Sequence, residues 1–174
     1  GKETRYSDSY DPNLLCPIPR VKARQAEQSP QTLPFIGVDV WTAYELSWLN
    51  LDGLPQIAIV EFMVPCDSDS IVESKSFKLY LNSFIQTKFA SMESVHSNLV
   101  KDLSAATGAT VEVTLYEISE YQGIQPIGEP QGYCIDREPI VIDTYIPDST
   151  LLTTESDAQV NETIFSHLLK TNCP

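Results

Sequence analysis

The sequence has few positive charges and no long apolar run, and each shortage excludes a class of function. It contains 11 Lys and Arg against 24 Asp and Glu, which gives a net charge of −13. A large contact with nucleic acid needs clustered positive side chains. No stretch approaches the roughly 20 apolar residues of a membrane helix, and residues 1–11 contain no apolar signal core. We therefore expect a cytoplasmic protein that contacts neither nucleic acid directly nor a membrane.

The chain also lacks the short motifs that hold common cofactors and metals. Neither GxGxxG nor GxxxxGK[ST] occurs, which excludes a Rossmann cofactor site and a P-loop. The four cysteines show no CxxC spacing, and the two histidines, His96 and His167, lie far from any cysteine pair in the sequence. We expect no zinc or other metal site. We also expect reduced thiols, because a chain of 174 residues can bury a core without disulfides.

Proline, turn and hydrophobic patterns divide the chain into three parts. Residues 1–34 carry prolines and basic breaks, which predict an extended arm that is ordered only if it lies on a body. Residues 35–147 contain the regular patterns and predict one folded module. Residues 148–174 begin as a polar, linker-like tail and end in a short amphipathic segment, 163–169.

The module shows two strand patterns, two helix patterns and two further strand patterns. Apolar alternation predicts a first strand whose apolar face carries Val38, Val40, Thr42, Tyr44, Leu46 and Trp48. The full set of predicted elements is strands 38–49 and 56–64, helices 73–89 and 92–107, and strands 111–115 and 139–146. This β-β-α-α-β-β order predicts an α+β fold, an antiparallel sheet with two helices on one face.

The start of the first predicted helix is the richest segment for binding chemistry. Glu73 can accept two donors from a planar ligand such as a guanine-like base. Lys75 and Lys78, with the helix N-terminus behind them, can hold phosphate groups. The alternative is structural: Glu73 completes a capping box with Ser70, and the lysines only solvate the outer face. The pattern alone favours this structural interpretation.

Cys173 is the second candidate. A thiolate is a strong nucleophile and can add to an electrophilic carbon, including that of a nitrile. The alternative is a small buried hydrophobe or a spare thiol, since free cysteines are more often inert than reactive. Spacing alone does not decide between these interpretations.

Several segments resemble one enzyme family. The run ESKSFKLY at residues 73–80, continuing through Phe84, resembles the signature motif of the 7-cyano-7-deazaguanine reductases of queuosine biosynthesis. Four further segments resemble the long, two-module form of that family: residues 41–50, 125–128, 134–136 and 166–174. Taken together, the resemblance extends from about Tyr10 onward.

The resemblance implies a tunnelling fold (T-fold), whose sheets join into barrels, and NADPH-dependent reduction of the nitrile of 7-cyano-7-deazaguanine. Val72, Glu73 and Ser74 would bind the substrate, and Ser74 and Lys75 would contact NADPH. Cys173 would attack the nitrile and form a covalent thioimide.

The resemblance also implies partners. In the long form, a proton-donating aspartate and a His-Glu pair follow the cysteine, so this chain would be the N-terminal part, joined by residues 148–174 to a C-terminal T-fold module and inactive alone. Exposed sheet edges favour a homo-oligomer. The alternatives are a T-fold module that binds a purine or pterin without chemistry, and a purely structural half-barrel.

Overall fold

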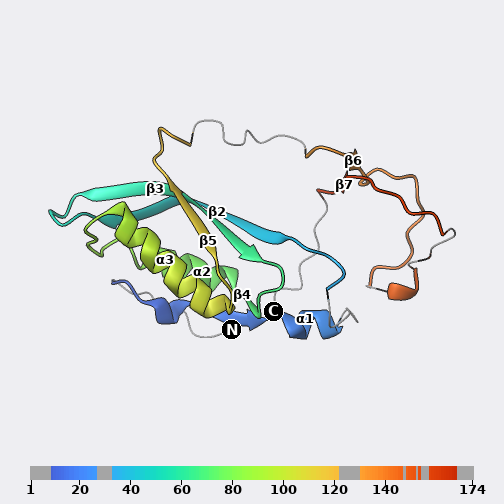
Figure 1. The fold of residues 1–174 in the computed structure, drawn as a ribbon, viewed down its shortest axis with the longest axis horizontal. Coiled ribbons are helices and arrows are strands. Elements are labelled where there is room, and N and C mark those ends of the chain that lie inside the picture. Colours follow the sequence, from blue (N-terminus) through green and yellow to red (C-terminus); the bar gives the residue numbers. More distant parts are fainter. Residues whose placement is uncertain are drawn as a thin grey trace.

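The computed structural model describes residues 9–26, 33–121, 130–146, 148–151, 153 and 157–167. Its body is a three-stranded antiparallel sheet in the order β2-β3-β5, formed by β2 (Val38–Leu49), β3 (Pro55–Pro65) and β5 (Glu112–Tyr116). Two helices, α2 (Ser74–Asn82) and α3 (Met92–Thr107), lie against one face of this sheet (Figure 1). The predicted class, α+β with an antiparallel sheet, is confirmed.

The hairpin between β2 and β3 closes as the turn residues predict. Asn50 accepts a hydrogen bond from the Leu54 amide on its side-chain oxygen, at 2.9 Å. Gly53 has φ +86°, a conformation that residues with a Cβ rarely adopt. The turn places Leu49 opposite Pro55 and so sets the register of the pair as far as Leu46, which lies opposite Ala58.

A bulge in β2 changes which side chains face the helices. Ala43 lies opposite Val60 and Leu46 opposite Ala58, so two residues of β2 oppose one residue of β3. Alternation therefore reverses partway along the strand, and the predicted single apolar face is wrong. The core side receives Trp41, Ala43, Leu46 and Trp48, whereas Val40 and Tyr44 are 57% and 61% exposed.

Helix α2 is shorter than predicted and starts differently. Its N-cap is Glu73, so the predicted cap at Ser70 is wrong. It ends at Asn82, where we expected a helix to residue 89, because the following turn joins the end of β2. The Leu49 amide donates to the Thr87 carbonyl at 2.9 Å, and the Phe89 amide donates to the Leu49 carbonyl at 2.8 Å.

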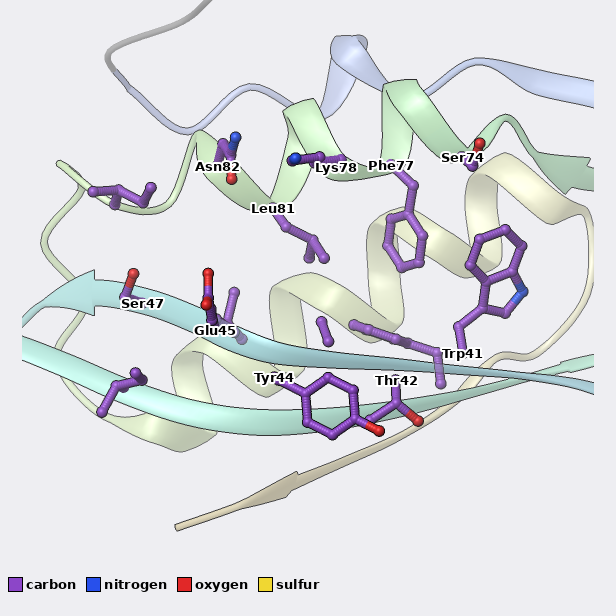
Figure 2. A pocket seen from close by; sticks show the side chains of 15 residues that line it. Trp41, Thr42, Tyr44, Glu45, Ser47, Ser74, Phe77, Lys78, Leu81 and Asn82 are labelled. Carbon is purple, nitrogen blue, oxygen red and sulfur yellow. The ribbon is translucent and has the colours of Figure 1, made fainter. Parts of the chain in front are cut away.

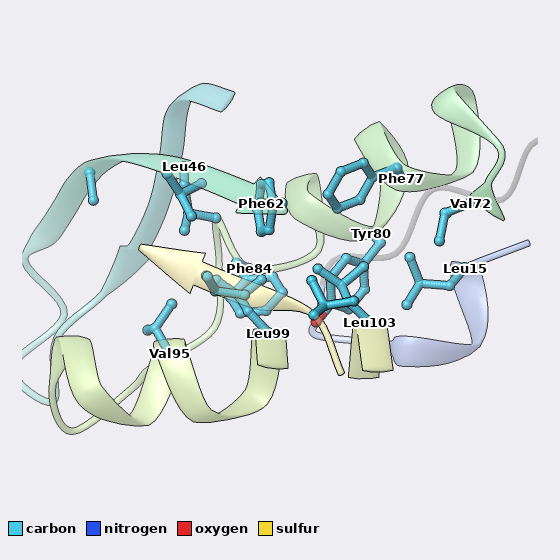
Figure 3. Close-up of a cluster of buried hydrophobic side chains, with 14 of the residues drawn as sticks. Leu15, Leu46, Phe62, Val72, Phe77, Tyr80, Phe84, Val95, Leu99 and Leu103 are labelled. Carbon is cyan, nitrogen blue, oxygen red and sulfur yellow. The ribbon is translucent and has the colours of Figure 1, made fainter. Parts of the chain in front are cut away.

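Helix α3 has the predicted bounds and caps. Ser91 caps its N-terminus in a reciprocal pair with Ser94, and Gly108 ends it at φ +74°. Its apolar stripe meets α2 and the sheet in one core (Figure 3). The fully buried side chains there include Phe62, Tyr80, Phe84, Val95, Leu99 and Leu103.

The described part of the N-terminal arm lies on this body. It forms a 3-10 turn, η1 (Pro12–Leu14), then β1 (Pro17–Pro19) and a helix, α1 (Arg20–Ala26). Strand β1 pairs antiparallel with β4 (Ser70–Val72), which leads directly into α2. The Arg20 side chain forms an ion pair with Asp39 of β2. The arm is therefore built into the structure that supports α2.

The C-terminal part departs from the prediction. Residues 139–146 form no strand, so the predicted fourth strand of the sheet is wrong. Alternation of apolar residues makes a strand only where a neighbouring edge supplies hydrogen bonds, and none of the described residues pairs with this run. Instead β6 (Tyr133–Cys134) pairs in parallel with β7 (Ile164–Phe165), and a second 3-10 turn, η2 (Ser149–Leu151), lies between them in sequence.

Among the described residues, no helix is both long and apolar enough to cross a membrane.

Candidate functional site at the start of helix α2

The junction of β4 and α2 holds the four residues that the sequence singled out for substrate and cofactor. Val72 ends β4 and is 6% exposed, and Ser74 and Lys75 are exposed in the first turn of α2. The Glu73 amide donates to the Cys16 carbonyl at 2.9 Å, and the Cys16 amide donates to Ser76 Oγ at 3.0 Å. The arm therefore holds both ends of the first turn of α2.

The Glu73 carboxylate caps its own helix. Its Oε2 accepts a hydrogen bond from the Ser76 amide at 3.0 Å, while Ser76 Oγ donates to the Glu73 carbonyl at 2.7 Å. The structural alternative for Glu73 is thus present in this conformation. Among the described residues, Oε1 makes no hydrogen bond, and a carboxylate offers about four acceptor positions. The cap therefore occupies only part of this group's capacity.

A groove of about 810 Å³ runs between α2 and β2. Figure 2 shows Ser74, Lys78 and Asn82 on the α2 side, with Phe77 and Leu81 below them. The β2 side is formed by the stretch from Trp41 to Ser47, which includes the bulge. Ser74 lines this groove, but Glu73 does not. The groove mixes aromatic walls with a few polar groups, which is the usual composition of a small-molecule site.

A buried carboxylate fixes α2 against α3. Asp102 Oδ2 accepts a hydrogen bond from the Tyr80 hydroxyl at 2.7 Å and another from the Tyr10 hydroxyl of the arm. Burial, and then these bonds to Asp102, raise the pKa of both tyrosines above the ordinary value near 10. Sequence patterns carry no signal for this cluster, because its three members are separated by 70 and 22 residues.

The remaining chemical candidate is Cys173, and the chain also contains His96 and three other cysteines. Cys173 lies outside the described residues, so its predicted role as nucleophile stays a prediction. His96 lies 2.9 Å through Nε2 from the Val113 carbonyl, where it joins α3 to β5. Among the described residues, Cys16, Cys66 and Cys134 form no disulfide.

A second cluster of chemical groups lies at the β6–β7 pair. The ligand atoms of Cys134, Asp136 and His167 all lie within 4.8 Å of one another. The sequence predicted that His167 lies far from any cysteine pair, and 33 residues do separate it from Cys134. The parallel pairing of β6 with β7 brings the two residues close together in space despite this separation in sequence. Spacing along the chain carries no signal for such a contact.

Asp136 is the centre of this cluster. Its Oδ1 accepts from Ser166 Oγ at 2.6 Å, and its Oδ2 accepts from the His167 amide at 2.9 Å. These two hydrogen bonds, the Ser166 hydroxyl first, lower the pKa of Asp136 below its ordinary value. The group is therefore ionised at neutral pH, and it ties the end of β7 to the loop after β6.

Comparison with known proteins places these features in a family. Residues 6–115 match the family described as nitrile reductase, 7-cyano-7-deazaguanine-reductase N-term. The chain is 52% identical over 176 residues to a protein of Cupriavidus metallidurans named NADPH-dependent 7-cyano-7-deazaguanine reductase, covering 99% of this chain and 63% of that protein.

Two further relatives carry the same name. The protein of Paraburkholderia phytofirmans is 52% identical over 175 residues, and that of Burkholderia multivorans is 49% identical over 175 residues; each match covers 100% of this chain. The chain spans 64% of the length of both relatives. Because the matched region contains the whole body and the ESKSFKLY segment at the start of α2, the chain belongs to the family of N-terminal parts of 7-cyano-7-deazaguanine reductases, which are nitrile reductases.

Proposed function

We propose that this chain is the N-terminal part of an NADPH-dependent oxidoreductase that reduces the nitrile of 7-cyano-7-deazaguanine to an aminomethyl group, a step of queuosine biosynthesis. The observation that carries the proposal is 52% identity, over 99% of the chain, to a reductase of that name. The start of α2 also supports it, because Ser74 lines the groove and both Ser74 and Lys75 are exposed at a helix N-terminus.

The proposed architecture is a T-fold half-barrel, with residues 35–147 as its module and residues 148–174 leading into a C-terminal T-fold module. Within the described residues, β2 and β5 each have a strand on one side only. Apolar side chains of residues 139–146 are widely exposed, with Val141 at 99% and Ile146 at 78%. Unpaired sheet edges, together with an exposed apolar run, fit a module that completes its sheet against another module or a second copy.

The proposed roles of the site residues follow from their positions. Glu73, helped by backbone groups of Val72 and Ser74, accepts hydrogen bonds from the N–H groups of the deazaguanine. It does so through the carboxylate acceptor positions that the helix cap does not use. Ser74 and Lys75 contact NADPH, since both are exposed and Lys75 supplies a positive charge. NADPH supplies the two hydrides that convert the nitrile to a primary amine.

Cys173 is the proposed nucleophile. Its thiol loses the Sγ proton, Sγ forms a bond to the nitrile carbon as one C–N π bond breaks, and the nitrile nitrogen takes up one proton, so the thioimide retains every atom of the substrate. The mass of the protein therefore rises by that of the whole nitrile. A noncatalytic base-binding module would bind the same base without this covalent step.

A fluorescence titration tests the site. The full chain is titrated with 7-cyano-7-deazaguanine while the emission of Trp41, which lines the groove, is followed. Glu73→Gln should weaken binding about 10- to 100-fold, because it removes a charge-assisted pair worth about 1.5–3 kcal/mol. The matched control is Glu93→Gln, an exposed glutamate in the first turn of α3.

The outcomes are distinct. Unchanged affinity in the folded Glu73→Gln variant would remove Glu73 from the site and leave its capping role alone. Binding without a mass increase on Cys173, in the protein that includes the C-terminal module, would favour the noncatalytic alternative.

A further inference from the structure

The β6–β7 pair gathers three different donor atoms. Cys134 offers its Sγ, Asp136 a carboxylate oxygen and His167 a ring nitrogen, all within 4.8 Å of one another. Register explains the meeting: Cys134 lies opposite Phe165, so the residues that follow each strand emerge side by side. Figure 1 shows β6 and β7 together, away from the helices of the body.

The donor set selects the kind of ion. Sulfur, nitrogen and oxygen from Cys, His and Asp are the ligands that Zn²⁺ takes, with bonds of about 2.0–2.3 Å. Calcium and magnesium prefer oxygen ligands only, so a thiolate excludes them as the natural occupant. Ligands at the corners of a zinc tetrahedron lie about 3.3–3.8 Å apart. The three ligand atoms, now within 4.8 Å of one another, reach these separations when each side chain moves by about an ångström or less.

The surroundings already orient the central ligand. Ser166 Oγ and the His167 amide hold the two oxygens of Asp136, and ligating carboxylates in metal sites carry such outer hydrogen bonds. Each oxygen keeps a second lone pair for an ion. The backbone behind the cluster is also tight, because a Cβ on Gly132 would lie 2.5 Å from the Thr163 carbonyl oxygen.

We propose that Cys134, Asp136 and His167 bind one Zn²⁺, leaving a fourth position open to water or to another ligand. The site is separate from the groove beside α2 and does not depend on the function proposed for that groove. Its effect is structural: the ion crosslinks the loop after β6 to the end of β7, and its binding energy stabilises a pair of two-residue strands.

Cobalt substitution tests the proposal directly. The full chain, kept reduced and free of chelators, is titrated with Co²⁺, which occupies zinc sites and gives a thiolate-to-metal absorption band in the near ultraviolet. One equivalent should produce the band, and Zn²⁺ should bleach it. Cys134→Ser should abolish the band, while Asp136→Asn and His167→Asn should each weaken Co²⁺ binding at least about tenfold.

Two control variants separate this site from incidental binding. Cys66→Ser removes another free, half-buried thiol, and Asp143→Asn removes an exposed carboxylate seven residues from Asp136. Neither should change the titration. The proposal fails if the wild type gives no band at a moderate excess of Co²⁺. It fails equally if the band survives Cys134→Ser or is lost to the same degree in Cys66→Ser.

Discussion

The body of the molecule and its C-terminal part are held together by different forces. From Val38 to Tyr116, two helices and three strands enclose a shared core in which Phe62, Tyr80 and Phe84 are 0–1% exposed. Among the described residues after Val113, none is buried. The body is thus stabilised by apolar burial, whereas the C-terminal part rests on a two-residue strand pair and a polar cluster.

This difference explains why the candidate site at the start of α2 is held in a defined geometry. The first turn of α2 is fixed by the core beneath Phe77, by the arm strand β1 and by the Asp102 cluster. The C-terminal part instead exposes an apolar run around Val141 that the body leaves uncovered. Exposed runs of apolar residues commonly mark interaction surfaces. The comparison predicts that the two parts respond independently to substitution.

The largest expected effect is in the core of the body. Phe84 is fully buried and packs edge-on against Tyr80 and face-on against Phe89. Phe84→Ala should lower the free energy of unfolding by about 3–5 kcal/mol, through lost burial and the cavity it leaves. Val141→Ala, at a fully exposed apolar position, should cost no more than about 0.5 kcal/mol. Urea denaturation followed by tryptophan fluorescence measures both. Equal losses would mean that the two parts share one core.

A smaller effect is expected at alkaline pH from the Asp102 cluster of the body. Tyr10 and Tyr80 stay protonated in the folded state well above their ordinary pKa, because of burial and their bonds to Asp102. Unfolded tyrosines ionise near pH 10. This contribution is complete below about pH 10, and above it the unfolded state releases protons that the folded state retains, so the free energy of unfolding falls.

Denaturation curves from about pH 9 to about pH 11 check this dependence. Tyr10→Phe should make the alkaline loss of stability shallower, because one of the two shifted hydroxyls is gone. Tyr145→Phe, at an exposed tyrosine of the C-terminal part, should leave the pH profile unchanged. An identical profile in all three proteins would show that the Asp102 cluster does not couple to unfolding.

The sequence predicted the body well because its signals are local. Asn50 and Gly53 define the hairpin, and Ser91 and Gly108 bound α3 within their own neighbourhoods. The bulge in β2 was missed, since it depends on how Ala58 and Val60 of the partner strand align with it. The strand predicted at residues 139–146 does not form, for a related reason. The apolar pattern of a segment does not show whether a neighbouring strand is available to pair with it.

The candidate sites divide in the same way. Residues 72–75 could be proposed from the sequence because the ESKSFKLY motif, residues 73–80, is contiguous, and the structure places this motif at a helix start. The direction of the Glu73 carboxylate, toward the Ser76 amide, was one of two open alternatives. The contacts of Asp102 and of Asp136 were invisible, because each joins segments far apart in the chain.

The smallest effect on overall stability should come from the glycine behind the β6–β7 pair. Gly132 has φ +125°, and a Cβ there would lie 2.5 Å from a backbone oxygen of Thr163, which cannot rotate away. Gly132→Ala should therefore break the bond from the Tyr133 amide to the Thr163 carbonyl, now 2.9 Å. Hydrogen exchange at the amides of Tyr133 and Ile135 should accelerate, while the free energy of unfolding of the body, measured by urea denaturation, stays within about 0.5 kcal/mol of its present value. Gly37→Ala is the matched control, since nothing lies within 4 Å of its added Cβ.

If Gly132→Ala lowers the stability of the body as well, the two parts unfold as one cooperative unit despite sharing no buried side chain. If instead only the local amides and the Co²⁺ affinity change, the strand pair is an independent element whose geometry the ion helps to set.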